Sequence, residues 1–251
     1  MKIVLEIGRY NTEMGEAPYS RTYEVDLPPD SRILDALMDV KRNQDGTLAF
    51  RKSCAHGVCG SDAMRINGTE RLACKTLLRD VVESEGAVVK IEPLRHQKVQ
   101  RDLMVDQSPF FQKYESVRPY LIPMEKDDSR EYIQSPEERE QFDDATKCIL
   151  CQACVSACPV PDENPDFIGP AAIVQAARFV FDSRDVGFEE RLGVLDQPNG
   201  VWSCENHFEC TRVCPRGIKV TKLINLTKRR IKKYRESRGE ETAEEAGGKP
   251  S

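Results

Sequence analysis

The stretch of sequence that decides the fold is Cys148-Ile149-Leu150-Cys151-Gln152-Ala153-Cys154-Val155-Ser156-Ala157-Cys158-Pro159. Its cysteines follow the spacing C-x2-C-x2-C-x3-C-P, by which protein thiolates hold cubane iron–sulfur clusters. The first three thiolates surround one cluster, and the fourth, which a proline follows, is directed toward a second cluster. Because a partner run lies further along the chain, we prefer this interpretation to four structural or disulfide cysteines.

The partner run is Cys204-Glu205-Asn206-His207-Phe208-Glu209-Cys210-Thr211-Arg212-Val213-Cys214-Pro215. It has the same spacing, except that His207 stands in place of one cysteine. Runs of this type exchange their last cysteine. We therefore predict a [4Fe–4S] cluster on Cys148, Cys151, Cys154 and Cys214. The remaining set is Cys158, Cys204 and Cys210, and three thiolates suit a [3Fe–4S] cluster.

His207 occupies the position of a fourth ligand in the second run. Imidazole replaces thiolate on iron in Rieske centres, so one interpretation is a second [4Fe–4S] cluster with His207 as a ligand. The other interpretation, which we favour, is a three-iron cluster with the histidine beside it. In that case the imidazole forms a hydrogen bond or faces a ligand pocket. Both interpretations stay open from the sequence.

A third set of candidate ligands lies in Cys54-Ala55-His56-Gly57-Val58-Cys59-Gly60-Ser61-Asp62 and at Cys74. The spacing matches the plant-type [2Fe–2S] pattern C-x4-C-x2-C…C, with Asp62 in place of the third cysteine. A carboxylate oxygen binds ferric iron, so Asp62 completes the predicted set. The alternative is a solvated aspartate, with Ser61 or another group as ligand. Gly57 and Gly60 suit a loop that directs backbone N–H groups at the sulfides.

Hydrophobic periodicity around this loop predicts a small α+β domain. Apolar residues alternate along the first strand, at Ile3, Leu5 and Ile7, and Asn67-Gly68 is a strong hairpin signal. The predicted elements are strands at 3–7 and 21–27, a helix from 33, a hairpin centred on residues 67–68 and a last strand at 89–91.

Beyond this domain the sequence predicts only helices. Gly169-Pro170 begins one, a periodic apolar face from Val220 to Tyr234 marks another, and Ser135 with Glu138 forms a capping box at a third. A connector rich in proline and charge runs from 119 to 134. We predict domains at 1–100 and 101–238, followed by a disordered polar tail at 239–251.

Composition narrows the class of protein. The 251 residues have room for two modest domains, and no apolar run approaches the roughly 20 residues of a membrane helix. The start of the chain is no signal peptide, so the ten clustered cysteines indicate a reducing compartment rather than a disulfide scaffold. The formal net charge of −5 gives no support to nucleic-acid binding.

These residues resemble the iron–sulfur subunit of succinate dehydrogenase and fumarate reductase, part of respiratory complex II, up to about residue 238. The resemblance rests on Cys54 to Asp62, Cys74, the run from Cys148 to Pro159, Ile168-Gly169-Pro170-Ala171-Ala172, Asp182-Ser183-Arg184-Asp185, Trp202-Ser203-Cys204 and Cys214-Pro215. Some members of the family also carry aspartate at the position of Asp62. The resemblance implies a plant-type ferredoxin β-grasp domain followed by an all-helical bacterial-type ferredoxin domain.

The resemblance also implies what the chain works with. It implies a flavoprotein with covalent FAD, where succinate and fumarate interconvert as in the tricarboxylic acid cycle, and a membrane anchor that binds quinone. The implied order of electron transfer is FAD, [2Fe–2S], [4Fe–4S], [3Fe–4S], quinone. The chain is then an oxidoreductase subunit that carries electrons and supplies no catalyst for the substrate chemistry. The expected location is peripheral, on the cytoplasmic face of the plasma (inner) membrane, held by the anchor.

The sequence departs from ubiquinone-linked family members at the quinone end. Those members have tryptophan soon after the Cys-Pro of the first run and histidine directly after the first cysteine of the second. Here Val160-Pro161 follows Pro159, and Glu205 follows Cys204, whereas 164–170 and 199–204 look more like fumarate reductases. This pattern is compatible with menaquinone, and with the same subunit running in reverse as a quinol:fumarate reductase. His207 is thus a candidate extra ligand or quinone-side residue.

Three other functions are weighed against this one. A soluble heterodisulfide- or glycolate-type reductase shares the chemistry but needs no membrane anchor. An iron–sulfur sensor or nucleic-acid-binding regulator predicts a basic docking surface and one cluster, unlike this acidic chain with three ligand sets. Structural zinc is disfavoured because C-x2-C-x2-C runs with crossed fourth ligands suit cubanes better than tetrahedral zinc.

A run of basic residues lies on the last predicted helix, at Lys228, Arg229, Arg230, Lys232 and Lys233. Most such runs are solvated helix faces, and we favour that interpretation. The alternative is contact with anionic lipid headgroups or with the anchor, worth about 1 kcal/mol per basic residue near a charged membrane.

Overall fold

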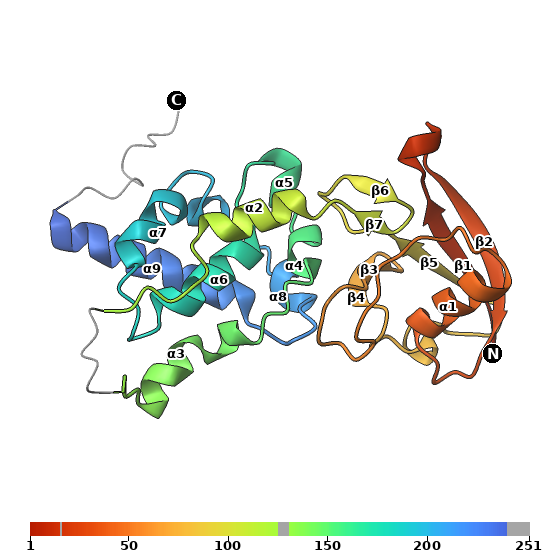
Figure 1. The fold of residues 1–251 in the computed structure, drawn as a ribbon, viewed down its shortest axis with the longest axis horizontal. Coiled ribbons are helices and arrows are strands. Elements are labelled where there is room, and N and C mark those ends of the chain that lie inside the picture. Colours follow the sequence, from red (N-terminus) through yellow and green to blue (C-terminus); the bar gives the residue numbers. More distant parts are fainter. Residues whose placement is uncertain (16, 125–130, 240–251) are drawn as a thin grey trace, which may run out of the picture.

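The computed structural model describes residues 1–15, 17–124 and 131–239. A sheet-containing domain lies at one end of the molecule and a helical domain at the other (Figure 1). The order of elements confirms the predicted α+β domain followed by an all-helical domain. Among the described residues, no helix combines the length and apolar character needed to cross a bilayer.

The first domain is built on a five-stranded mixed sheet in the order β2-β1-β5-β3-β4. β1 and β5 are parallel, and the other neighbouring strands are antiparallel. The predicted hairpin at Asn67-Gly68 is confirmed, because these residues join β3 to β4. The elements of this sheet domain are β1 (Lys2–Arg9), η1 (Thr12–Met14), β2 (Tyr19–Asp26), α1 (Ile33–Asn43), β3 (Ala63–Ile66), β4 (Thr69–Leu72), η2 (Leu78–Asp80) and β5 (Val88–Glu92).

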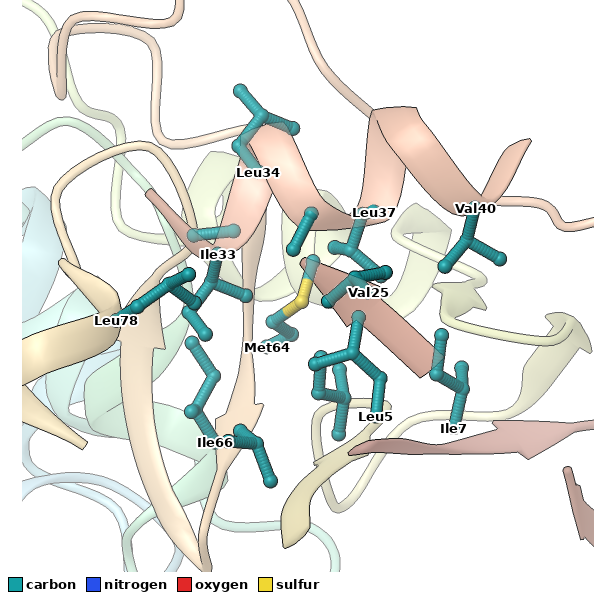
Figure 2. Packing of buried hydrophobic residues seen from close by; sticks show 14 of the residues in the cluster. Leu5, Ile7, Val25, Ile33, Leu34, Leu37, Val40, Met64, Ile66 and Leu78 are labelled. Carbon is teal, nitrogen blue, oxygen red and sulfur yellow. The ribbon is translucent and has the colours of Figure 1, made fainter. Parts of the chain in front are cut away.

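Helix α1 covers one face of this sheet and closes the first hydrophobic core. The face of α1 that carries Ile33, Leu37 and Val40 points toward Leu5 and Ile7 of β1 (Figure 2). All five side chains are completely buried, which stabilises the fold by roughly 1.5–3 kcal/mol for each large apolar residue. The chain that leaves α1 runs through the Cys54–Asp62 loop to β3.

The buried face of β1 ends in a charged residue, Arg9. Its guanidinium donates to Asp45 at 2.6 Å and to Asp102 at 3.0 Å, and both carboxylates are buried. Asp102 lies in the turn between β6 (Val99–Arg101) and β7 (Met104–Val105), two short strands that the sequence analysis missed. Because this hairpin is tied to β1, we propose that the first domain continues through β7, slightly past the boundary predicted at residue 100.

The described part of the second domain contains helices and no β-strand. The predicted helices beginning at Gly169-Pro170 and at Val220 are confirmed as α6 and α9, which pack against each other. Ile173 and Leu223 are buried between them in the second hydrophobic core. The helices are α2 (Ser108–Ser116), α3 (Pro136–Thr146), α4 (Ala153–Ser156), α5 (Val160–Glu163), α6 (Pro170–Val180), α7 (Phe188–Leu195), η3 (Val201–Ser203), α8 (Glu209–Arg212) and α9 (Val220–Arg238).

The connector predicted at 119–134 is fastened at its start by Arg191 of α7. Its side chain is completely buried and pairs with Asp185 at 2.7 Å. The same guanidinium donates to the backbone carbonyl oxygens of Arg118 at 3.1 Å and Tyr120 at 2.8 Å. Apart from one bridge at Pro123, the described part of the connector at 119–134 is irregular, as predicted. Residues 125–130 and the predicted tail from 240 onward lie outside the described residues.

The predicted capping box at the start of α3 is confirmed. Ser135 Oγ accepts from the backbone N–H of Glu138 at 3.2 Å, and the Glu138 carboxylate accepts from the N–H of Ser135 at 2.8 Å.

We expect Ser135→Ala to lower the free energy of unfolding by about 1 kcal/mol, because the helix loses its cap. Anaerobic thermal unfolding should show this as a drop in the midpoint of about 2–4 °C. The control is Ser237→Ala at the exposed end of α9, where an equal loss would contradict the capping argument.

Candidate metal centres

The first candidate centre combines the loop between α1 and β3 with Cys74, which lies shortly after the end of β4. Cys54 and Cys59 come from the loop, and Cys74 is buried beneath them. The backbone N–H groups of His56 and Cys59 donate to the Cys54 sulfur, with N···S distances of 3.4 and 3.3 Å. These donors stabilise a thiolate and lower the pKa of Cys54 to about 6. The loop is therefore shaped to hold negatively charged sulfur.

Asp62 lies inside this centre. The residue is only 3% exposed, and its Oδ2 accepts from the backbone N–H of Cys74 at 2.7 Å. Its Oδ1 is buried and has no hydrogen-bond partner within the described structure, which is a costly state for a carboxylate oxygen. Burial, together with the adjacent Asp62 carboxyl group, raises the pKa of Cys74 to about 12. Three thiols and one unpaired carboxylate oxygen fit the ligand set predicted for a [2Fe–2S] cluster.

The alternative ligand at this centre, Ser61, has a different neighbour. Its Oγ lies 3.1 Å from the sulfur of Cys59 and is close enough for a hydrogen bond. A hydroxyl so placed supports the neighbouring thiolate, whereas the unpaired oxygen of Asp62 has no other partner. The geometry therefore favours Asp62 over Ser61, and ligation by Asp62 remains our prediction.

Asp62→Cys is expected to leave a [2Fe–2S] cluster assembled with a midpoint potential changed by on the order of 100 mV, because a thiolate donates more charge to iron than a carboxylate. Redox titration of the complex, followed by electron paramagnetic resonance (EPR), measures this potential. The matched control is Asp80→Cys, since Asp80 is exposed in the same domain. An unchanged potential in Asp62→Cys would argue that Asp62 is not a ligand.

The second candidate centre is a hollow in the helical domain beside α6 and the start of α9. It is lined by Cys148, Cys151, Cys154 and Cys214 together with apolar side chains that include Leu150, Ala171, Val174, Ile218 and Val220. Burial raises the pKa of Cys151 to about 12 and that of Cys154 well above its usual range. Thiols in such an apolar site keep their protons until a metal binds the sulfur and displaces the proton. The four cysteines gathered here are those predicted to hold the [4Fe–4S] cluster.

The third candidate centre lies between α8, α9 and the start of α5. The sulfur-bearing residues that line it are Cys158, Cys204 and Cys210. Burial raises the pKa of Cys158 to about 11, and the sulfur of Cys210 lies 3.5 Å from the hydroxyl of Thr221. Cys158 of the first run thus lies with the second run, and Cys214 of the second lies with the first. The structure brings together the crossed sets expected from the spacing.

The two cysteine runs repeat one backbone design. Helices α4 and α8 each follow a residue with a left-handed backbone, Gln152 (φ 68°) and Phe208 (φ 64°). Two residues earlier, Leu150 (φ 54°) and Asn206 (φ 62°) are left-handed as well. Alternation of left- and right-handed residues turns successive N–H groups toward one side, which favours an anion there. Equivalent positions of the two runs therefore have equivalent backbone geometry.

His207 is the residue equivalent to Cys151 in this repeat. It borders the third hollow, but its side chain is 44% exposed and its Nε2 lies 3.0 Å from a carboxylate oxygen of Glu205. A histidine that faces Glu205 agrees better with a residue beside a three-iron cluster than with a fourth iron ligand. Its role stays a prediction.

Part of the basic run on α9 faces the protein itself. Lys228 donates to the carbonyl oxygen of Cys204 at 2.7 Å, and Arg230 lies over the ring of Phe188. Lys232 lies 5.8 Å from the centre of the Trp202 ring. The sequence analysis missed these contacts because their partners are distant in the sequence. Arg229, Arg230 and Lys233 are exposed, so the two interpretations of the basic run now concern these residues.

In the second and third centres the cysteines line a hollow rather than converge on one point. Among the described residues, no three histidine, cysteine, aspartate or glutamate side chains converge closely enough to bind a single metal ion. An iron–sulfur cluster distributes its protein ligands over several iron atoms, so its ligands stand further apart than those of one zinc ion.

Comparison with known domain families agrees with these centres. Residues 4–112 match the family described as the 2Fe-2S iron-sulfur cluster binding domain. Residues 144–218 match the 4Fe-4S dicluster domain. The chain is therefore a ferredoxin-type iron–sulfur protein, in which a [2Fe–2S] domain precedes a helical domain of the [4Fe–4S] dicluster type.

Its relatives define the family further. The fumarate reductase iron-sulfur subunit of Mycobacterium tuberculosis (strain CDC 1551 / Oshkosh) is 43% identical over 219 residues, which cover 86% of this chain and 87% of that protein. The chain belongs to the family of iron–sulfur subunits of succinate dehydrogenase and fumarate reductase, and it is an electron-carrying subunit of that class of oxidoreductase. The predicted resemblance is confirmed.

Solved structures show the same fold. A chain of the Mycobacterium smegmatis Sdh1 complex in the apo form matches with a TM-score of 0.82 and 28% identity, over 93% of this chain and 96% of that one. A hypothetical protein from Helicobacter pylori matches with a TM-score of 0.55 and 17% identity, over 90% of this chain and 39% of that one. The second likeness concerns the fold alone.

Proposed function

We propose that this chain conducts electrons from the FAD of a flavoprotein subunit to a membrane quinone during the oxidation of succinate to fumarate. When bound, the [2Fe–2S], [4Fe–4S] and [3Fe–4S] clusters supply the one-electron chemistry. The observation that carries the proposal is the serial arrangement of three cysteine-lined centres. The loop of the first centre lies against Cys151 of the second, and the crossed residues Cys158 and Cys214 join the second to the third.

The residues of the chain have distinct tasks in this proposal. Cys54, Cys59, Asp62 and Cys74 hold the [2Fe–2S] cluster; Cys148, Cys151, Cys154 and Cys214 hold the [4Fe–4S] cluster; and Cys158, Cys204 and Cys210 hold the [3Fe–4S] cluster. Apolar side chains from α6 and α9 exclude water from the second centre. Backbone N–H groups beside Cys54 stabilise thiolate charge in the first centre.

The partners follow from the same proposal. Cys54, Cys59, Asp62 and Cys74 would hold the cluster that supplies one-electron transfer on the flavoprotein side. Cys158, Cys204 and Cys210 would hold the one that supplies it on the side of the quinone and its membrane anchor. The anchor then holds the chain on the cytoplasmic face of the membrane. The sequence after Pro159 and at Glu205, which departs from ubiquinone-linked members, supports menaquinone as the quinone. The likeness to a fumarate reductase subunit supports the reverse direction, quinol:fumarate reduction, as a second candidate.

Anaerobic EPR of the purified complex, oxidised and then reduced in steps, tests the proposal together with iron analysis of this chain. We expect a [3Fe–4S] signal in the oxidised state and about nine iron atoms per chain. Absence of that signal from intact protein with about ten iron atoms per chain would make His207 a cluster ligand. Purification of a soluble complex without a membrane anchor would instead support a soluble reductase.

A further inference from the structure

The loops of the first and second centres touch directly, backbone against backbone. A Cβ atom placed on Gly60 would lie 2.7 Å from the Cβ and 2.9 Å from the Cα of Cys151. It would also lie 3.0 Å from the carbonyl oxygen of Ile149. Carbon atoms in contact normally stand about 3.5–4.0 Å apart, so only a residue without a side chain fits between the two loops.

Neither side of this contact has freedom to move away. Gly60 has a left-handed backbone with φ of 70°, which the turn of its own loop requires. Cys151 lies between the left-handed residues Leu150 and Gln152, and both Ile149 and Cys151 pack against the core of the first domain. A side chain at position 60 would therefore have to push the two loops apart rather than displace a flexible neighbour.

A second contact holds the two domains together beside the first. Ser156, on α4 between two cluster cysteines, donates to the Glu70 carboxylate of β4 at 2.8 Å. Its Oγ also accepts from the backbone N–H of Arg95 at 2.8 Å. Ser156 is completely buried and Glu70 is 6% exposed, so this hydrogen bond is shielded from water. Loss of one partner would leave a buried polar group unsatisfied.

We propose that Gly60 is a positioning residue that sets the separation between the first and second centres, with the Ser156–Glu70 hydrogen bond holding the two loops in contact. The proposal rests on the proposed function, because the separation matters for electrons that pass between these centres. Electron transfer weakens steeply with distance, and magnetic coupling between two reduced clusters falls with the cube of their separation. A small displacement of the loops is therefore measurable.

Gly60→Ala in the assembled complex tests the proposal, with Gly68→Ala as the matched control. Gly68 lies in the hairpin turn of the same domain with a φ of 78°, and its added Cβ would meet nothing of the described structure within 4 Å. Both variants carry left-handed strain, and only Gly60→Ala presses on the second domain. We expect weaker EPR coupling between the reduced [2Fe–2S] and [4Fe–4S] clusters in Gly60→Ala, and wild-type coupling in Gly68→Ala.

Hydrogen exchange at the amide of Arg95 provides a readout that needs no cluster signal. An extra methyl group in a close-packed contact destabilises the closed state relative to the opened one. The typical effect raises the population of the opened state about tenfold. We therefore expect exchange at Arg95 to be about tenfold faster in Gly60→Ala than in Gly68→Ala. The proposal would be overturned if both variants kept the wild-type EPR coupling and the same Arg95 exchange rate. It would also be overturned if both variants lost the coupling to the same extent.

If Gly60→Ala does not assemble its [2Fe–2S] cluster, substitution of Glu70 tests the contact between the domains through its hydrogen bond with Ser156. Glu70→Gln keeps an oxygen that accepts from Ser156 and should keep the wild-type coupling, whereas Glu70→Ala should weaken it. Wild-type coupling in Glu70→Ala would then overturn the proposal. Wild-type protein that lacks the three cluster signals would instead refute the proposed function, while the exchange comparison still decides whether the contact exists.

Discussion

Cys214→Ser is expected to abolish the [4Fe–4S] signal of the reduced complex and to stop electron transfer to quinone, while the [2Fe–2S] signal remains. Cys214 belongs to the second run in sequence, but it lines the second centre with the three cysteines of the first run. A cluster ligand must lose its proton, and a serine hydroxyl does so far less readily than a thiol. EPR, iron analysis and quinone reduction of the purified complex measure the loss.

Cys158→Ser is the matched variant, because the same substitution is made at the equivalent position of the first run. It should remove the oxidised-state [3Fe–4S] signal and leave the [4Fe–4S] signal in place, since Cys158 lines the third centre. The opposite assignment, in which each variant loses the cluster of its own run, would show that the runs do not cross. The pair of variants therefore tests the crossing separately from the need for cysteine.

Arg191→Leu is expected to lower the free energy of unfolding by about 3–5 kcal/mol, because it leaves the buried carboxylate of Asp185 without its partner. Both side chains are at most 1% exposed. The substitution also removes the donor to two carbonyl oxygens of the connector, at Arg118 and Tyr120. For a chain of this length, the expected drop in the thermal midpoint is about 6–20 °C.

Arg139→Leu provides the control for this prediction. Arg139 pairs with Asp143 at 2.9 Å on the exposed surface of α3, where an ion pair contributes about 0–1 kcal/mol. Anaerobic thermal unfolding of both variants, followed by circular dichroism, measures the difference. Equal thermal midpoints for the two variants would mean that loss of the buried Arg191–Asp185 pair costs no more stability than loss of the exposed pair.

The features that the sequence could predict are local in the chain or fixed by ligand spacing. Asn67-Gly68 specifies its hairpin through two adjacent residues, and Ser135 with Glu138 specifies a cap within one turn. Alternation of apolar residues was enough to place β1, and helical periodicity placed α6 and α9. The grouping of cysteines followed from the spacing of the two runs, because runs of this type exchange their last cysteine.

The features that the sequence could not predict depend on residues brought together by tertiary packing. Arg9 reads as the polar end of a strand, but Asp45 and Asp102 meet it from distant parts of the chain. Arg191 lies among charged neighbours of α7, and no pattern there indicates complete burial. The need for glycine at position 60 had a local explanation in the loop, whereas its contact with Cys151 became visible only once the domains were placed.

The crossing of Cys158 and Cys214 has a consequence for the order in which the protein is made. The first three cysteines of the second centre leave the ribosome well before their fourth partner, which lies just ahead of α9. The third centre is incomplete until synthesis has passed Cys210, and the second until it has passed Cys214. Iron delivered earlier would meet only partial sets of thiols. Cofactor insertion into this domain is thus expected to be a late event that follows chain folding and fills two neighbouring sites in one stage.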